Sequence, residues 1–309
     1  MALATDLAEV VGGAIGLRLL FGLPLVVGAI LTAAVALLVL AVGDRWGQGV
    51  LERVIMGFLV LVAVGFVAGL VVDGPDGGEV ASGLVPSFAG ADSVLLASGI
   101  VGATVMPHAI YLHSSLTTER HATARAHRSM ADLLSATRVD VGLALALAGV
   151  LNLALLVVAA TSLSGVSGTG TLPGAHAVIG ERLGGGVALL FAVALLGSGL
   201  ASTSVGSAAG AEIMRSLLGW HVPPVVRRLA TLVPAVVVLV AGADPTRSLV
   251  LSQVALSLGV PFAIVPLVWL TSQVSVLGEH RNHSVTTALA VACAAVIVAL
   301  NVALVVLML

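Results

Sequence analysis

The chain has 309 residues, of which 59% are hydrophobic and 9% are charged, with a formal net charge of −2. Soluble globular domains carry roughly a quarter charged residues, so the composition excludes a soluble domain and predicts a polytopic membrane protein. The small net charge gives no indication of a nucleic-acid partner. The single cysteine, Cys293, excludes an intramolecular disulfide framework and a multi-cysteine zinc site.

Apolar runs of about 20 residues predict nine transmembrane passes in a single domain that covers residues 1–309. We expect the passes near residues 1–16, 22–42, 50–72, 92–118, 139–162, 186–210, 225–242, 248–271 and 285–308. All thirteen basic residues are arginines. If the N-terminus is cytoplasmic, ten of them lie in inside links and only Arg18, Arg182 and Arg247 lie outside. This bias is the positive-inside pattern, so we expect a cytoplasmic N-terminus.

The first pass contains two carboxylates, Asp6 and Glu9. Their i, i+3 spacing places them on the same side of one helix. A charged side chain in the middle of a membrane costs about 2.5–3.5 kcal/mol on insertion scales, so two of them on one stripe predict a polar path or a partner. The alternative is that both lie in water at the start of the chain.

The fourth pass, residues 92–118, cannot be one straight helix. Pro107 has no N–H and its ring clashes with the carbonyl four residues earlier, and Gly99 and Gly102 loosen the turns before it. In lipid, broken backbone is tolerated only where it is buried in protein or lines a polar cavity. Interrupted membrane helices hold the substrates of secondary transporters, so this stretch predicts transport rather than catalysis.

Met106 and His108 lie on either side of this proline. The thioether of Met106 suits Mn²⁺, Fe²⁺ or Cd²⁺ better than Ca²⁺ or Mg²⁺, which prefer oxygen; the alternative is that Met106 only fills space. His108 follows two residues later and should point away from the thioether. Because an imidazole titrates near neutral pH, His108 is a candidate proton relay, or else a neutral, hydrogen-bonded core histidine.

Two later passes carry further candidates. Arg227 and Arg228 open the seventh pass at its cytoplasmic end, as positive-inside anchoring predicts. In the eighth pass, Gln253 is a buried amide that must find a partner, and an interhelical hydrogen bond is one candidate. We expect Pro261 and Pro266 to interrupt this helix further along.

Small and polar residues also predict helix contacts. The pairs Gly12/Gly16 and Gly206/Gly210 have the spacing of close helix packing in lipid, although chance alone produces such pairs in a chain with 36 glycines. We interpret Asn301, in the last pass, as a structural residue between helices.

The run Ala103 to His108 (Ala-Thr-Val-Met-Pro-His), with Tyr-Leu-His-Ser at 111–114, resembles the sixth transmembrane helix of the Nramp-type divalent metal transporters. The resemblance covers essentially the whole chain in the family's order, through Ala4-Thr-Asp-Leu-Ala-Glu9, Arg227-Arg228, Leu251-Ser-Gln-Val254 and Pro261-Phe-Ala263. It implies an all-α, broken-helix, inverted-repeat (LeuT-like) fold without enzymatic activity or a cofactor. The implied function is proton-coupled transport of Mn²⁺ or Fe²⁺ across a bacterial plasma membrane by alternating access.

The resemblance also implies roles for individual residues. The metal ligands are expected around the break and on the eighth pass: Met106, the carbonyl of Ala103, and Gln253 in an occluded state. The proton pathway is expected to consist of ionisable side chains: Asp6, Glu9, His108 and one of Arg227 and Arg228.

In the family, the Ala-Thr-Asp-Leu-Ala-Glu motif lies in the third helix, and the first helix carries an Asp-Pro-Gly-Asn break that supplies hard oxygen ligands. This chain contains no Asp-Pro-Gly-Asn, and Asp244-Pro245 is followed by Thr246. The resemblance therefore implies an N-terminally truncated member without the first two helices and the start of the third. Such a chain is expected to bind Mn²⁺ weakly or not at all, and not to transport it alone.

Three other functions are compatible with the sequence. The same architecture could carry an amino acid, whose carboxylate would meet helix N-termini and would not need a thioether. An intramembrane metalloenzyme using His108 and His113 would lack the His-Glu-x-x-His pattern. The implied truncation makes a non-transporting remnant with a packing or regulatory role the third alternative.

Overall fold

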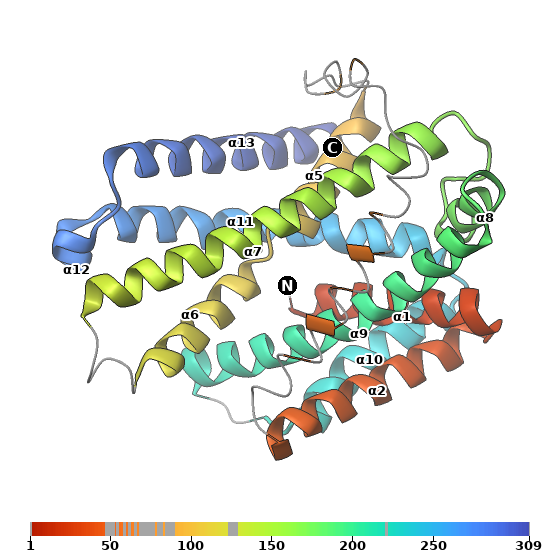
Figure 1. Cartoon of the computed structure of the whole chain (residues 1–309), viewed down its shortest axis with the longest axis horizontal. Coiled ribbons are helices and arrows are strands. Elements are labelled where there is room, and N and C mark those ends of the chain that lie inside the picture. Colours follow the sequence, from red (N-terminus) through yellow and green to blue (C-terminus); the bar gives the residue numbers. More distant parts are fainter. Residues whose placement is uncertain are drawn as a thin grey trace.

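A computed structural model of the chain describes residues 2–46, 90–122, 129–219 and 222–308, together with isolated positions between 47 and 89. Helices account for nearly all of these ranges, and no strand occurs within them (Figure 1). The predicted pass at residues 50–72 lies outside the continuously described ranges. The prediction of an all-α chain is confirmed for the described residues.

One group of helices is built around the start of the chain. It consists of α1 (Ala2–Phe21), α2 (Leu25–Trp46), α9 (Gly185–Leu218) and α10 (Pro224–Val240). The chain turns by 114° between α1 and α2, where Gly22 has a φ of 68° and Pro24 follows. Small residues let these helices approach each other, and the core of the group contains Val10, Ala14, Ala29 and Ala235.

Glycines bring α1 and α9 closest together. A Cβ on Gly16 would lie 2.9 Å from the backbone nitrogen of Leu196, and a Cβ on Gly199 would lie 2.8 Å from the backbone nitrogen of Gly13. Real Cβ atoms essentially never approach other atoms so closely, so these positions require glycine. The predicted pairs are therefore only half correct, because a Cβ on Gly12 or Gly210 would meet no described atom within 4 Å.

A second group contains the broken pass. It consists of α5 (Ala91–Thr104), α11 (Pro245–Ser272) and α13 (Ser284–Met308), with Val94, Val254 and Leu304 in its core. The helix α6 (Pro107–Ala122) continues from α5 and packs against α9, and α1 packs against α11. The two groups are thus joined at α1 and α6, close to the candidate residues.

The prediction that Pro261 and Pro266 interrupt the eighth pass is wrong. α11 runs as one helix from Pro245 to Ser272 with both prolines inside it. Pro261 removes the N–H that would bond to the carbonyl of Ser257, but the side chain of Asn301 on α13 donates to that carbonyl at 3.0 Å. A neighbouring helix therefore replaces the donor that Pro261 removes, as happens in membrane proteins.

The remaining helices flank the two groups. They are α7 (Met130–Val158) with a π-helical turn at Ala159–Leu163, α8 (Leu172–Arg182), α12 (Val274–Leu277) and a 3₁₀ turn at Gly278–His280. α7 crosses the front of the molecule in Figure 1 and exposes large apolar side chains, including Leu143, Leu145 and Val150. Such a long exposed apolar surface is expected of a helix that faces lipid.

Five helical segments of the described residues are long and apolar enough to cross a membrane, or six if the bent pair α1–α2 is counted as one span. The protein is therefore an integral membrane protein. The division into nine passes within one domain stays a prediction.

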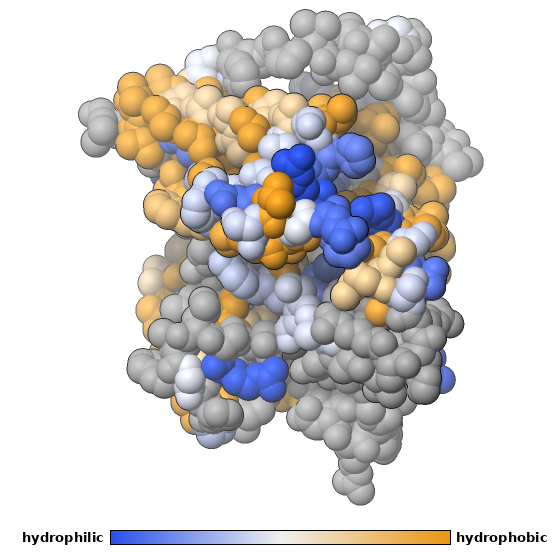
Figure 2. All heavy atoms as spheres, turned by 90° about the vertical axis from the view of Figure 1, so that its left-hand side faces the viewer, coloured by the Kyte–Doolittle hydropathy of each residue, from blue (hydrophilic) through white to orange (hydrophobic). Residues whose placement is uncertain are grey.

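The arginines of the described helices lie in two groups, at opposite ends of the molecule. The ends of α1 and α8 and the start of α11, which carry Arg18, Arg182 and Arg247, lie at the right of the molecule in Figure 1. The ends of α6 and α9, which carry Arg120 and Arg215, and the first third of α7, which carries Arg138, lie at the left. Viewed from that left end, polar residues gather in the middle between apolar flanks (Figure 2).

Candidate functional site

The fourth predicted pass is broken where the sequence predicts the break. α5 ends at Thr104 and α6 begins at Pro107, and Val105 and Met106 between them are not helical. Val105 is extended, with φ −102° and ψ 92°. The two halves together form a segment, Ala91–Thr118, that is long and apolar enough to cross a membrane. The prediction of an interrupted helix at this point is confirmed.

The break leaves the carbonyl of Ala103 without its helical hydrogen bond. In an α-helix the donor to this carbonyl would be the N–H of residue 107, and residue 107 is a proline, which has none. Ala103 is exposed and Met106 is half-buried. A carbonyl oxygen that has lost its helical donor and a thioether sulfur therefore lie within three residues of each other.

Gln253 lies on α11 against the turn of α5 that precedes the break. A Cβ on Gly102 would overlap the backbone carbonyl oxygen of Gln253 and lie 2.8 Å from the Ser257 nitrogen. The side-chain Oε1 of Gln253 is buried and has no hydrogen-bond partner in the described part of the chain. The candidate interhelical hydrogen bond is thus not made by this oxygen. A buried polar atom without a partner costs about 1–3 kcal/mol, which a bound cation or a water would recover.

The two carboxylates of α1 are buried. Asp6 is 4% exposed and Glu9 is 8% exposed, so the alternative that they lie in water is wrong. A Cβ placed on Gly206 of α9 would lie 2.9 Å from Oδ1 of Asp6 and 3.2 Å from Oε2 of Glu9. Both side chains therefore lie on the same side of α1, as their spacing predicts, and both face α9.

The structure gives less detail for the other candidates. His108 is the second residue of α6, and Arg227 and Arg228 lie in the first two turns of α10. The side chains of these three residues lie outside the described part of the structure. His113 is exposed on α6, with its Nε2 3.5 Å from the hydroxyl oxygen of Thr117.

No three histidine, cysteine, aspartate or glutamate side chains come together as a metal site within the described residues. The metalloenzyme hypothesis therefore finds no histidine–carboxylate cluster there. The donors that lie at and beside the break are a thioether and neutral carbonyl oxygens. This donor set suits a borderline-soft divalent ion, because sulfur adds little to the binding of Ca²⁺ or Mg²⁺.

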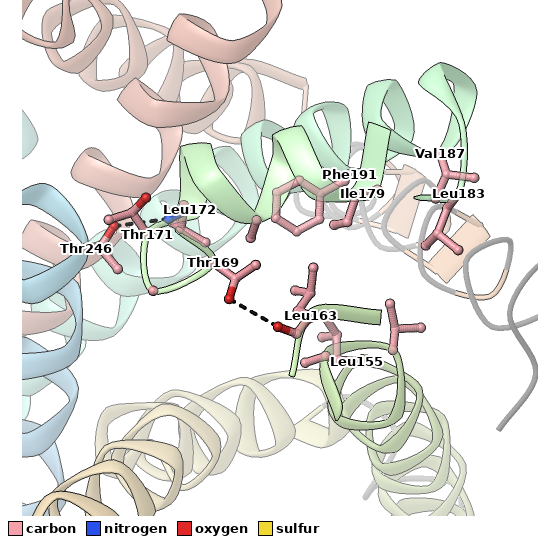
Figure 3. Close-up of a pocket in the computed structure, with 14 residues that line it drawn as sticks. Leu155, Leu163, Thr169, Thr171, Leu172, Ile179, Leu183, Val187, Phe191 and Thr246 are labelled. Atoms are coloured by element: carbon pink, nitrogen blue, oxygen red, sulfur yellow. Dashed lines mark hydrogen bonds between the residues drawn. The ribbon is translucent and has the colours of Figure 1, made fainter. Parts of the chain in front are cut away.

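A separate cavity of about 280 Å³ lies between the π-helical turn, α8, and the starts of α9 and α11 (Figure 3). Its lining is mostly apolar and includes Leu163, Ile179 and Phe191. The hydroxyl of Thr169 donates to the Leu163 carbonyl at 3.1 Å, and that of Thr246 accepts from the Leu172 N–H at 3.2 Å. Because apolar cavities tend to stay dry, this cavity does not suit a hydrated cation, and no candidate ligand lines it.

Two glycines have contacts that the sequence does not predict. Gly102 not only loosens a turn but is the point where α5 meets the backbone of α11. Gly206 not only has the packing spacing with Gly210 but is the surface that the carboxylates face. A glycine near polar membrane residues is the available signal, but the sequence does not indicate which helix it meets.

Comparison with known proteins agrees with these features. Residues 1–307 match the family described as natural resistance-associated macrophage protein-like, or Nramp. The divalent metal cation transporter MntH of Mycobacterium tuberculosis is 51% identical over 305 residues, which are 99% of this chain and 71% of that protein. The protein of the same name from Deinococcus radiodurans is 42% identical over 303 residues, which are 97% of this chain and 69% of that protein.

A solved structure shows the same fold. The Eremococcus coleocola manganese transporter, crystallised with an aromatic bis-isothiourea substituted compound, matches with a TM-score of 0.79 and 27% sequence identity. The match covers 99% of this chain and 69% of that transporter. The family match over nearly the whole chain, the identity to curated relatives and this shared fold lead to one conclusion: the chain belongs to the Nramp family.

Proposed function

We propose that this protein carries out secondary-active, proton-coupled transport of divalent transition-metal ions, such as Mn²⁺ and Fe²⁺, across the cell membrane by alternating access. The names of its relatives support the choice of cargo, since they are divalent metal cation and manganese transporters. The observation that carries the proposal is the helix break at Val105–Met106, which brings a thioether to an interrupted, membrane-spanning segment. Interrupted helices are the usual binding elements of secondary transporters.

The proposed metal ligands are Met106 Sδ and the carbonyl oxygen of Ala103, with Oε1 of Gln253 joining in an occluded state. Each is supported by a different observation: the position of Met106 in the break, the missing donor at Pro107, and the buried Oε1, which has no partner among the described residues. The direct packing of α11 on Gly102 supports a role for Gln253 beside the break. The thioether would select transition metals over Ca²⁺ and Mg²⁺, which prefer oxygen.

The proposed proton route starts at Asp6 and Glu9 and involves His108 and one of Arg227 and Arg228. The burial of both carboxylates supports it, because charged groups inside a membrane protein are costly and commonly mark ion or proton pathways. α1, which carries the carboxylates, also packs against α11, which carries Gln253. A rotation of either helix group would therefore move residues of both the proton route and the metal site.

The proposed location is the bacterial plasma membrane, with the arginine-rich helix ends and the N-terminus in the cytoplasm. The separation of arginines between the two ends of the molecule supports this orientation. In this proposal, metal ions and protons are transported. The exposed apolar helices contact the lipid bilayer.

Changing Met106→Ala should lower the selectivity for Mn²⁺ over Ca²⁺ by about tenfold or more, equivalent to ~1.4 kcal/mol. The reason is that the variant loses the one soft ligand while the oxygen ligands remain. The ratio of the two affinities is measured by equilibrium binding with both ions in competition. Flux of each ion into proteoliposomes is measured next. The ratio of the two affinities is informative even at low affinity, because both ions compete for the same site.

The matched control is Met130→Ala, because Met130 is exposed at the start of α7. This variant should keep the wild-type ratio. An unchanged ratio in Met106→Ala would contradict the proposed ligand set and favour a cargo, such as an amino acid, that does not need a thioether. Metal binding without flux in proteoliposomes would instead favour the non-transporting remnant.

A further inference from the structure

The carboxylates of Asp6 and Glu9 converge on a single point of α9. A Cβ built on Gly206 would lie 2.9 Å from Oδ1 of Asp6, and 3.2 and 3.6 Å from the two carboxylate oxygens of Glu9. Gly206 itself is buried. Both side chains thus occupy the space that any other residue at this position would fill.

This convergence also sets an upper limit on the distance between the two carboxylates. Because both oxygens lie close to one point, they are within about 6 Å of each other, the range in which two like charges influence each other's protonation. Groups that interact in this way titrate as a pair. The protonation of the pair therefore depends on where the two carboxylates lie, and a small displacement is sufficient to change it.

Gly206 differs from the other close-packed glycines of this interface. At Gly16 and Gly199 the nearest atoms belong to backbone, of Leu196 and Gly13, so a side chain there would push the helices apart. At Gly206 the three nearest atoms are all carboxylate oxygens, which are the far ends of side chains that can rotate. A methyl group at 206 would displace the carboxylates and leave the helix pair together.

We propose that Gly206 is a positioning residue for the Asp6–Glu9 pair: it provides the side-chain-free surface of α9 that sets the position, and hence the shared protonation, of both carboxylates. The functional meaning of this inference rests on the proposed proton route. The positional claim itself concerns only the two carboxylates and α9.

The test is an infrared titration of the carboxylic-acid C=O band of the full 309-residue chain in lipid nanodiscs. The double variant Asp6→Asn, Glu9→Gln identifies the part of the band that belongs to the pair. Gly206→Ala should move the pH midpoint of that part by about one unit, a tenfold change in proton affinity. The control Gly210→Ala, where a Cβ would meet no described atom within 4 Å, should titrate as the wild type does.

A purely structural role for Gly206 gives different results. Gly16→Ala, which forces the backbones of α1 and α9 apart at Leu196, should lower the thermal midpoint of unfolding without a specific shift of the carboxyl band, whereas Gly206→Ala should keep the thermal midpoint close to that of the wild type. A wild-type titration in Gly206→Ala overturns the proposal, and so does an equal shift in Gly210→Ala. If Gly206→Ala fails to fold, adding Asp6→Ala removes the nearest oxygen and should restore folding; persistent misfolding overturns the proposal.

This titration does not use metal binding or transport. If Gly206→Ala shifts the band but the protein does not transport metal, the proposed function is rejected and the positioning role of Gly206 is kept. If the protein transports metal but Gly206→Ala does not shift the band, the proposed function is kept and the positioning role is rejected.

Discussion

Replacing Asn301 by leucine is expected to lower the free energy of unfolding by about 1–3 kcal/mol for each buried group that loses its partner. Asn301 accepts a hydrogen bond from the Ser257 hydroxyl at 2.9 Å and donates to the Ser257 carbonyl at 3.0 Å. Both residues are buried. Interhelical hydrogen bonds in membrane proteins contribute about 0.6 kcal/mol on average. We expect more here because Pro261 has removed the only helical donor to the carbonyl.

A double-mutant cycle separates this special role from an ordinary contact. Pro261→Ala restores an N–H one turn after Ser257, so the carbonyl regains its helical donor. In that background, Asn301→Leu should cost only about as much as the average interhelical hydrogen bond, ~0.6 kcal/mol. The measurement is reversible unfolding in mixed detergent micelles for the wild type, both single variants and the double variant.

The control for this cycle is Asn152→Leu, because Asn152 is exposed on α7. It should change stability little, and its effect should not depend on residue 261. Equal costs of Asn301→Leu with proline and with alanine at position 261 would show that Asn301 does not substitute for the missing donor.

Replacing Gly102 by alanine is expected to destabilise the protein by about 1–3 kcal/mol and to weaken metal binding in the same variant. The added Cβ would overlap the backbone carbonyl of Gln253 and lie 2.8 Å from the Ser257 nitrogen. Because these are backbone atoms of a long helix, relief requires α5 and α11 to separate. The separation would move Gln253 away from Ala103 and Met106, which follow Gly102 in the chain.

The matched control is Gly99→Ala, one turn earlier on the same helix. A Cβ there would meet its nearest atom, a methyl carbon of Val254, at 3.6 Å, an ordinary contact distance. Thermal unfolding and metal titration of both variants test the prediction. If Gly102→Ala is as stable as Gly99→Ala and binds metal equally well, the close approach of α5 and α11 is not what holds Gln253 at the site.

The two prolines show how far the sequence predicts this fold. Pro107 breaks its helix as predicted, whereas Pro261 does not break α11, although both lack the same N–H. At Pro261 the missing donor is replaced by Asn301, which lies 44 residues from Ser257 in the chain. Local sequence indicates that a carbonyl loses its donor, but only the packing of α13 against α11 shows that the donor is replaced.

The candidate site follows the same division. The spacing of Asp6 and Glu9 predicts one shared face, and the structure confirms it. What that face meets could not be predicted, because helix pairing in lipid depends on the fit of small residues over long distances in sequence. The Gly-xxx-Gly spacing correctly predicts that Gly16 and Gly206 lie at helix contacts. It does not indicate Gly13 and Gly199, where α1 and α9 come closest.

The central claim is that Met106 places a sulfur ligand at a break in a membrane helix. X-ray absorption spectroscopy at the cadmium edge tests it directly, using Cd²⁺ bound to the full chain in nanodiscs. We predict a mixed shell of oxygen and one sulfur, with the sulfur contribution lost in Met106→Ala and kept in Met130→Ala. A shell of oxygen alone in the wild-type chain, or a sulfur contribution that survives Met106→Ala, would contradict the account.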